Sequence, residues 1–394
     1  MLDKKTMLAA ALALAATACS ANGNSNGSLP ALGSVQNDAF GLARHAASVS
    51  ILKLLAKQEV IGSTVAANGD QNPYGLAIPT FTYKGAVKHD LYSCNFNDKA
   101  NVQGAGTTIV SLTPVAGSAT TPFVQSHDLL GCAATAFDSS DDLWAASYGV
   151  KGIAEISAGT GKITIHKGAA YVHPWGLTFA TTGGAYPTSA VFASDAETGD
   201  VILVASCSSG QCAYAGTPIV TGFPVNKGKP GRIFAPSGLV FDPNASITVK
   251  GVGTLPGALY VVDGKDNTVV GIYNVLNLRS KNSIVVGKTG KTFSGPEGSW
   301  ARVLYSGSAL RGPISAALVS TSASKPGNLV VGNTVGPNNL VEISPTGQVL
   351  DTVDVDKGAA GALFGIMAMP GTYGAKTQLF FNDDNANNVQ VLEK

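Results

Sequence analysis

A short apolar motif recurs along this chain, and repetition at intervals of tens of residues constrains a fold more strongly than any local pattern. The motif joins a glycine or alanine to two or three apolar residues, and its six copies begin at Pro73, Ala134, Pro174, Pro236, Ala316 and Phe364. A second apolar run follows each copy, and an Asn/Asp/Gly turn with a third run follows most of them. Six units of four short strands predict an all-β fold, a six-bladed β-propeller, in which radial repetition leaves only short sheet edges.

The composition favours β-structure as well. Of the 394 residues, 47 are Gly and 19 are Pro, whereas charged residues make up only 13%. Long helices need more Glu, Lys and Leu, and the Val- and Thr-rich runs favour strands. The formal net charge of +1 provides no basic surface for nucleic acid, so nucleic-acid partners are excluded. We also expect the chain to be a monomer.

The two ends of the repeat region predict how the ring closes. The last unit stops after its third strand at Val391, and an apolar run at 60–65 precedes the first unit. We expect this N-terminal strand to supply the missing fourth strand of the last unit. Fourth strands of other units are expected at 162–165, 283–286 and 348–350. Apolar residues at helical spacing predict a short helix over 39–57, and 289–313 is the longest expected insertion.

The first residues predict export. Lys4 and Lys5 precede an apolar run at 7–16 that is too short to span a membrane, and Cys19 follows small residues. We interpret 1–18 as a signal peptide of the lipoprotein type, 19–35 as a flexible tether and 36–394 as the propeller. In this interpretation Cys19 is acylated and anchors the chain in the periplasm or at the cell surface. Ordinary cleavage nearby is the alternative.

Four further cysteines agree with an exported chain. They are Cys94, Cys132, Cys207 and Cys212, and an even number in an exported protein suggests disulfides. Three pairings are possible, and proximity along the chain favours Cys94 with Cys132 and Cys207 with Cys212. The spacing suits neither a zinc site nor a CxxC redox couple.

The best-preserved unit resembles an NHL repeat. The resemblance is carried by a glycine–apolar start, an apolar run that ends in Asp, and Asn before the third strand, at 236–239, 259–263, 266–269 and 387–391. It covers about residues 60 to 394 and implies the six-bladed fold. Proteins of this shape include binding scaffolds, extracellular sensor domains, lactonases and a zinc-dependent amidating lyase, so the resemblance does not select a chemistry.

Residues just before or at the start of each unit's first strand are expected at the mouth of the central channel. The candidate binding residues are Tyr74, His127, Asp128, His173, Trp175, Arg232 and Arg311. Imidazole nitrogens are good metal ligands, and the resembled lyase holds zinc on histidines in its channel. We therefore consider His127 and His173 as ligands of a divalent metal, zinc or calcium. The alternative is that they are ordinary turn residues, and no cofactor is certain.

Acidic and amide residues recur where second strands end, at Asp195, Asp263, Asn333 and Asp383. Carboxylates in such a ring could bind calcium. We favour the alternative, in which these side chains accept hydrogen bonds from backbone N–H groups and stabilise the turns.

Two classes of function are compatible with these residues. The favoured one is a scaffold at the bacterial cell envelope that recognises a protein, peptide or glycan through the channel mouth and the 289–313 insertion, which carries Phe293 and Trp300. The alternative is a metal-dependent lyase or lactonase that uses His127, His173 and Arg232 in the channel. A purely structural envelope protein would need neither ligand nor metal.

Overall fold

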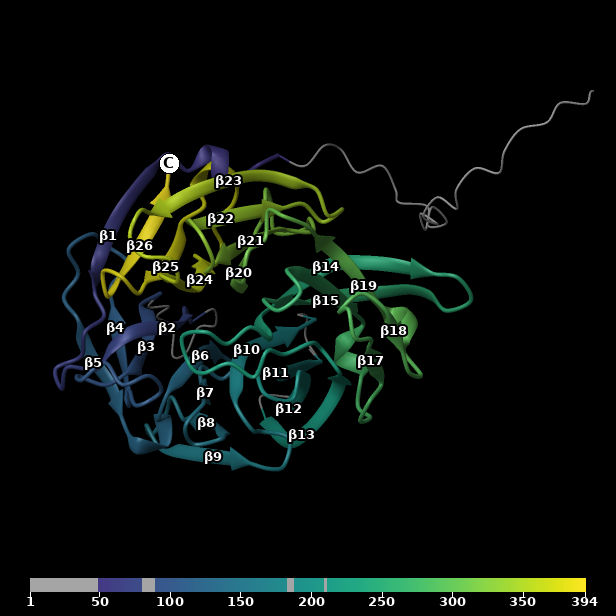
Figure 1. Cartoon of the computed structure of the whole chain (residues 1–394), viewed down its shortest axis with the longest axis horizontal. Coiled ribbons are helices and arrows are strands. Elements are labelled where there is room, and N and C mark those ends of the chain that lie inside the picture. The colour runs from purple at the N-terminus through teal and green to yellow at the C-terminus, as the bar shows by residue number, and fades with distance from the viewer. Residues whose placement is uncertain (1–48, 80–88, 183–187, 209–210) are drawn as a thin grey trace, which may run out of the picture. The chain divides into compact units, whose positions relative to one another are not determined.

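A computed structural model describes residues 49–79, 89–182, 188–208 and 211–394, which lie in one compact unit, 44–394. Six sheets, antiparallel except for one parallel pair of strands in the third, surround a central axis (Figure 1). The all-β, six-bladed propeller is therefore confirmed. In these residues the helical elements are 3-10 turns: η1 (Leu52–Leu54), η2 (His127–Leu129), η3 (Val275–Asn277), η4 (Gly298–Trp300) and η5 (Gly374–Lys376).

Each blade contributes four strands, from the central axis outwards. The innermost strands, in ring order, are β2 (Gln71–Ala77), β6 (Cys132–Phe137), β10 (Pro174–Thr181), β14 (Pro236–Val249), β20 (Pro313–Val319) and β24 (Leu363–Ala368). The second strands are β3 (Leu91–Asn97), β7 (Leu143–Ser147), β11 (Ser189–Asp195), β15 (Gly253–Asp263), β21 (Asn328–Asn333) and β25 (Leu379–Asp383). The third strands are β4 (Thr108–Leu112), β8 (Gly152–Ile156), β12 (Asp200–Ser208), β16 (Thr268–Tyr273), β22 (Asn338–Ile343) and β26 (Asn388–Glu393). The outermost strands are β5 (Thr121–Gln125), β9 (Ile163–Lys167), β13 (Gln211–Thr221), β19 (Ala301–Ser306), β23 (Val349–Asp356) and β1 (Lys57–Ser63).

The glycine of the repeated motif lies where neighbouring innermost strands approach each other. A Cβ atom at Gly238 would lie 2.7 Å from Ser315 Cα in the next blade, and one at Gly365 would lie 2.6 Å from Leu76 Cβ. A larger residue would force these strands apart. The motif is therefore repeated because six innermost strands must crowd around a narrow axis.

The first and last strands of the described propeller lie in one sheet. β1 pairs antiparallel with β26, with Lys57 opposite Glu393 and Ser63 opposite Asn388. On the inner side of the same blade, β24 packs beside β2 of the first blade. Ile61 of β1 is buried with Leu112 and Val391 in a core between the two blades.

Both expected disulfides are confirmed. Cys94–Cys132 joins β3 of the first blade to β6 of the second, and both cysteines are fully buried. Cys207–Cys212 joins β12 to β13 across the end of a hairpin. The first disulfide thus links two blades, whereas the second lies within one.

The prediction that 283–286 forms the outer strand of the fourth blade is wrong. β17 (Ile284–Val286) instead pairs in parallel with β13 of the third blade, and β18 (Phe293–Ser294) extends that sheet. The fourth blade's outer strand is β19, within the segment predicted as an insertion. Its apolar pattern is interrupted by Arg302, whose Nε donates to the Tyr273 hydroxyl at 3.1 Å.

The predicted helix over 39–57 is also wrong over its described part, and 39–48 lies outside the described residues. The 3-10 turn η1 is followed by β1, which begins at Lys57. The backbone N–H groups of Ile51 and Leu52 donate to the Glu342 carboxylate, and the backbone is already extended at Leu55. In the described part of the chain, no helix has the length and apolarity needed to cross a membrane.

Candidate functional site

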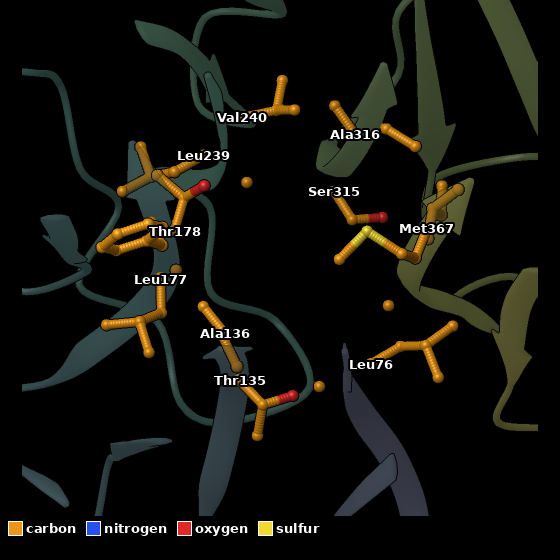
Figure 2. Close-up of a pocket in the computed structure, with 18 of the residues that line it drawn as sticks. Leu76, Thr135, Ala136, Leu177, Thr178, Leu239, Val240, Ser315, Ala316 and Met367 are labelled. Atoms are coloured by element: carbon orange, nitrogen blue, oxygen red, sulfur yellow. The ribbon is translucent and has the colours of Figure 1, made fainter. Parts of the chain in front are cut away.

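The channel cavity lies on the central axis of the propeller and has a volume of about 340 Å³. All six innermost strands contribute to its wall. Figure 2 labels ten of the lining residues: Leu76, Thr135, Ala136, Leu177, Thr178, Leu239, Val240, Ser315, Ala316 and Met367. Their side chains surround an open space, into which Met367 reaches from β24 (Figure 2). The cavity is thus built from the same segments that carry the repeated motif.

The channel cavity is largely apolar. No Asp, Glu, Lys, Arg or His is among the described residues that line it, and the polar lining side chains are those of Thr135, Thr178, Thr181, Ser237 and Ser315. Ser237 Oγ donates to the Val262 carbonyl oxygen at 3.2 Å. Thr135 Oγ1 and Ser315 Oγ are buried and have no partner among the described residues. The surface that faces this cavity is therefore mainly apolar, and both of these hydroxyl oxygens are buried in its wall.

A layer of aromatic side chains closes one end of this cavity. The Tyr74 ring stacks between Phe96, at a centroid distance of 4.3 Å, and Phe364, at 3.6 Å. Trp175 meets Tyr74 edge-on at 5.9 Å. These rings bury one another, and three of them, Tyr74, Trp175 and Phe364, also line a second cavity. The layer therefore separates two compartments.

The mouth pocket is this second cavity, with a volume of about 190 Å³. It is lined by Tyr74, Gln103, Trp175, Gly231, Ile233, Phe234, Ile314, Thr334, Ala360, Gly361, Phe364 and Asp384. The Tyr74 hydroxyl donates to Gln103 Oε1 at 3.3 Å. Burial, reinforced by the neighbouring Asp383, raises the pKa of Asp384 to about 7. Burial and the Asp384 carboxylate raise the pKa of the Tyr74 hydroxyl well above its usual range.

Of the seven residues expected at the channel mouth, Tyr74 and Trp175 line both cavities. The other five line neither: His127, Asp128, His173, Arg232 and Arg311. All but His173 are exposed. The structure therefore brings together the two aromatic candidates and leaves the ionisable ones outside.

His173 has a local explanation. Its backbone N–H donates to Asp195 Oδ2 at 2.8 Å, and its ring stacks on Tyr148 at 4.2 Å. Its Nδ1 lies 3.8 Å from Glu197 Oε2. Within the described ranges, no group of three or more His, Cys, Asp or Glu side chains is arranged to hold a metal ion.

The turn interpretation of the recurring Asp and Asn residues is confirmed. Asp195 Oδ1 accepts from the N–H groups of Glu197 and Thr198. Asp263 and Asp383 likewise accept backbone hydrogen bonds within their turns, and Asn333 Oδ1 accepts from Arg311 N. These side chains connect the ends of second strands to neighbouring loops.

Among the cavity residues that the sequence did not predict are Thr135, Ser315, Gln103 and Asp384. Thr135 lies in one of the two weaker copies of the motif, and Ser315 directly precedes the other, where other copies have glycine. A hydroxyl in an apolar repeat was thus the signal that could have found them. Asp384 follows Asp383 in a turn rich in Asn and Asp, and nothing in that composition separates a pocket residue from a turn residue.

Comparisons with known proteins find likeness only in solved structures. No family model and no curated protein matches the chain, so the NHL resemblance stays a prediction. The structural neighbours are six-bladed propellers.

Three of these neighbours cover most of the chain. A gluconolactonase from Xanthomonas campestris is 13% identical with a TM-score of 0.49, over 84% of this chain and 88% of that one. Regucalcin, a calcium-binding protein from Agrobacterium tumefaciens, is 13% identical with a TM-score of 0.49, over 85% and 94%. Virginiamycin B lyase from Staphylococcus aureus is 12% identical with a TM-score of 0.45, over 86% and 99%. Such values carry no argument about the activity of this chain.

Proposed function

We propose that this chain is an exported binding protein whose channel cavity holds the apolar part of a ligand. The observation that carries the proposal is the lining: apolar side chains from six strands and no Asp, Glu, Lys, Arg or His among the described lining residues. Ligand sites are typically apolar cavities in which a few polar groups orient the ligand. Two disulfides fit an oxidising compartment, and acylation at Cys19 would hold the propeller at the envelope.

The cavity narrows the class of ligand. A volume of about 340 Å³ suits a small molecule or an apolar side chain of a peptide or protein. A glycan is less suitable, because its many hydroxyls would need more polar partners than the cavity offers.

The lyase or lactonase alternative has less support. Metal-dependent catalysis needs several ligands on one site, and the described residues contain no such group. His127, His173 and Arg232 line neither cavity. A binding role requires only the apolar channel.

The test uses the chain with Cys19→Ser, which prevents acylation, and the apolar fluorophore N-phenyl-1-naphthylamine. We expect saturable binding with one site per chain. Thr178 lines the channel cavity and is half-buried, so Thr178→Trp should fill the space and weaken binding at least about tenfold. Thr254→Trp, at an exposed position of β15, is the matched control. Absence of saturable binding, or equal weakening by both folded variants, would refute the proposal.

A further inference from the structure

The mouth pocket contains a carboxylate without a counter-charge. Asp384 lies in the turn between β25 and β26, where its backbone N–H donates to the Ala362 carbonyl oxygen at 2.8 Å. Its Oδ1 is buried and has no hydrogen-bond partner among the described residues. The ion pairs of the described chain do not include Asp384. Buried polar atoms nearly always have a hydrogen-bond partner, so the absence of a donor to this oxygen needs an explanation.

The other walls of the mouth pocket are mainly apolar. Aromatic carbons come from Tyr74, Trp175, Phe234 and Phe364, and no Lys, Arg or His is among the described lining residues. The remaining polar side chains are those of Gln103 and Thr334. A negative charge among aromatic walls repels anions and attracts a cation that carries its own apolar carbons.

We propose that the mouth pocket binds the alkylammonium group of a ligand. The ammonium N–H groups donate to the Asp384 carboxylate, whose charge has no ion-pair partner among the described residues. The alkyl carbons contact the aromatic walls, and the Gln103 and Thr334 side chains accept further N–H bonds at the rim. A calcium ion would need six or more oxygen ligands, more than these side chains offer.

Binding of the alkylammonium should weaken as the pH is lowered. Burial and Asp383 raise the pKa of Asp384 to about 7, whereas an alkylammonium stays protonated to about pH 10. Tyr74 stays neutral across this range because its pKa is raised. Affinity should therefore be highest between about pH 8 and 9.5 and should fall below about pH 7, where Asp384 takes up a proton.

The experiment is a calorimetric titration of the Cys19→Ser chain with n-butylammonium chloride at pH 8. We expect one site per chain. Asp384→Asn keeps the shape of the side chain but removes its charge, and should weaken binding by about thirtyfold. Asp354→Asn is the matched control, because Asp354 is exposed on β23, and it should bind like the parent chain. Circular dichroism establishes that both variants are folded.

Four further probes define the chemistry of the ligand. Neutral 1-butanol and tetramethylammonium should both bind at least about tenfold more weakly, since the first has no charge and the second no N–H to donate. Nα-acetyl-lysinamide and putrescine then distinguish a lysine side chain from a free diamine as the source of the ammonium. Equal binding of butanol or tetramethylammonium, or equal binding by Asp384→Asn, would overturn the proposal.

The proposals for the two sites can be tested independently. The mouth pocket and the channel cavity lie on opposite sides of the aromatic layer. Thr178→Trp should remove binding of the apolar fluorophore and leave butylammonium binding unchanged. Loss of both ligands in that folded variant would mean a single continuous site and would contradict the proposal.

Discussion

At the scale of single residues, one buried carboxylate holds the segment at 50–52 against the fifth blade. Glu342 is fully buried on β22. Its oxygens accept from Ser50 Oγ at 2.7 Å, from Asn328 Nδ2 at 2.6 Å and from the backbone N–H groups of Ile51 and Leu52. Four donors compensate for the cost of burying the charge.

Replacing this carboxylate should release the segment at 50–52. In Glu342→Gln an amide N–H₂ replaces one acceptor, so at least one donor loses its partner, and we expect a loss of about 2 kcal/mol in the free energy of unfolding. Urea denaturation measures it, and hydrogen exchange should speed up at 51–53. Glu59→Gln, which removes only a partly exposed pair with Lys57, should cost less than about 1 kcal/mol. Equal losses would contradict this role for Glu342.

A second buried carboxylate makes stability depend on pH. Burial raises the pKa of Asp263 to about 7, far above the value of about 3.9 in an unfolded chain. The folded protein therefore binds this proton more tightly, and its stability is greatest below about pH 4 and falls as the pH rises to about 7. The loss from this group is up to about 4 kcal/mol.

Asp263→Asn should remove that part of the pH dependence. The variant keeps the acceptor for Lys265 N and carries no charge at any pH. We expect the free energy of unfolding to fall less between pH 4 and pH 8 than in the parent chain, measured by urea denaturation at both values. Exposed Asp354→Asn should leave the slope unchanged. An identical slope in Asp263→Asn and the parent would show that the prediction is wrong.

At the scale of elements, contact between neighbouring innermost strands depends on glycine. Gly238→Ala would place a methyl group 2.7 Å from Ser315 Cα and 3.0 Å from Ala316 N, and these are backbone atoms that cannot rotate away. We expect a loss of about 3 kcal/mol in the free energy of unfolding. Gly159→Ala, where a Cβ meets nothing within 4 Å, is the control for the change of residue type. Similar melting temperatures for the two variants would show that crowding at the axis is not what requires the glycine.

At the scale of the whole molecule, β1 connects the described beginning of the chain to its last blade. Ile61 is buried between the first and sixth blades, whereas the adjacent Val60 is 49% exposed. Ile61→Ala should cost about 2–5 kcal/mol, and Val60→Ala less than about 1 kcal/mol. Thermal unfolding of both variants checks this difference. If both melt alike, β1 contributes little to holding the ring together.

The propeller fold could be predicted because the sequence pattern that produces a blade is repeated six times. Four of the six blades have glycine at the same position beside the axis. The apolar alternation and the polar turns also recur from blade to blade, so six weak copies reinforce one another. The exceptions were places where the repeat is interrupted. Arg302 interrupts the apolar pattern of β19. Ile284 lies in the neighbouring blade's sheet, and no local pattern shows that placement.

The repeat, the turn residues and the cysteine spacing are local properties, and they were sufficient to predict six blades and both disulfides. Only the tertiary structure decided which residues face the axis. Strands far apart in sequence bring Thr135 and Ser315 into one apolar cavity, and the turn after β25 carries Asp384 to the aromatic layer around Tyr74. Each cavity is lined by residues of several blades, so the sequence of one blade does not predict it. The burial that raises the pKa of Asp384 likewise arises only when the blades pack together.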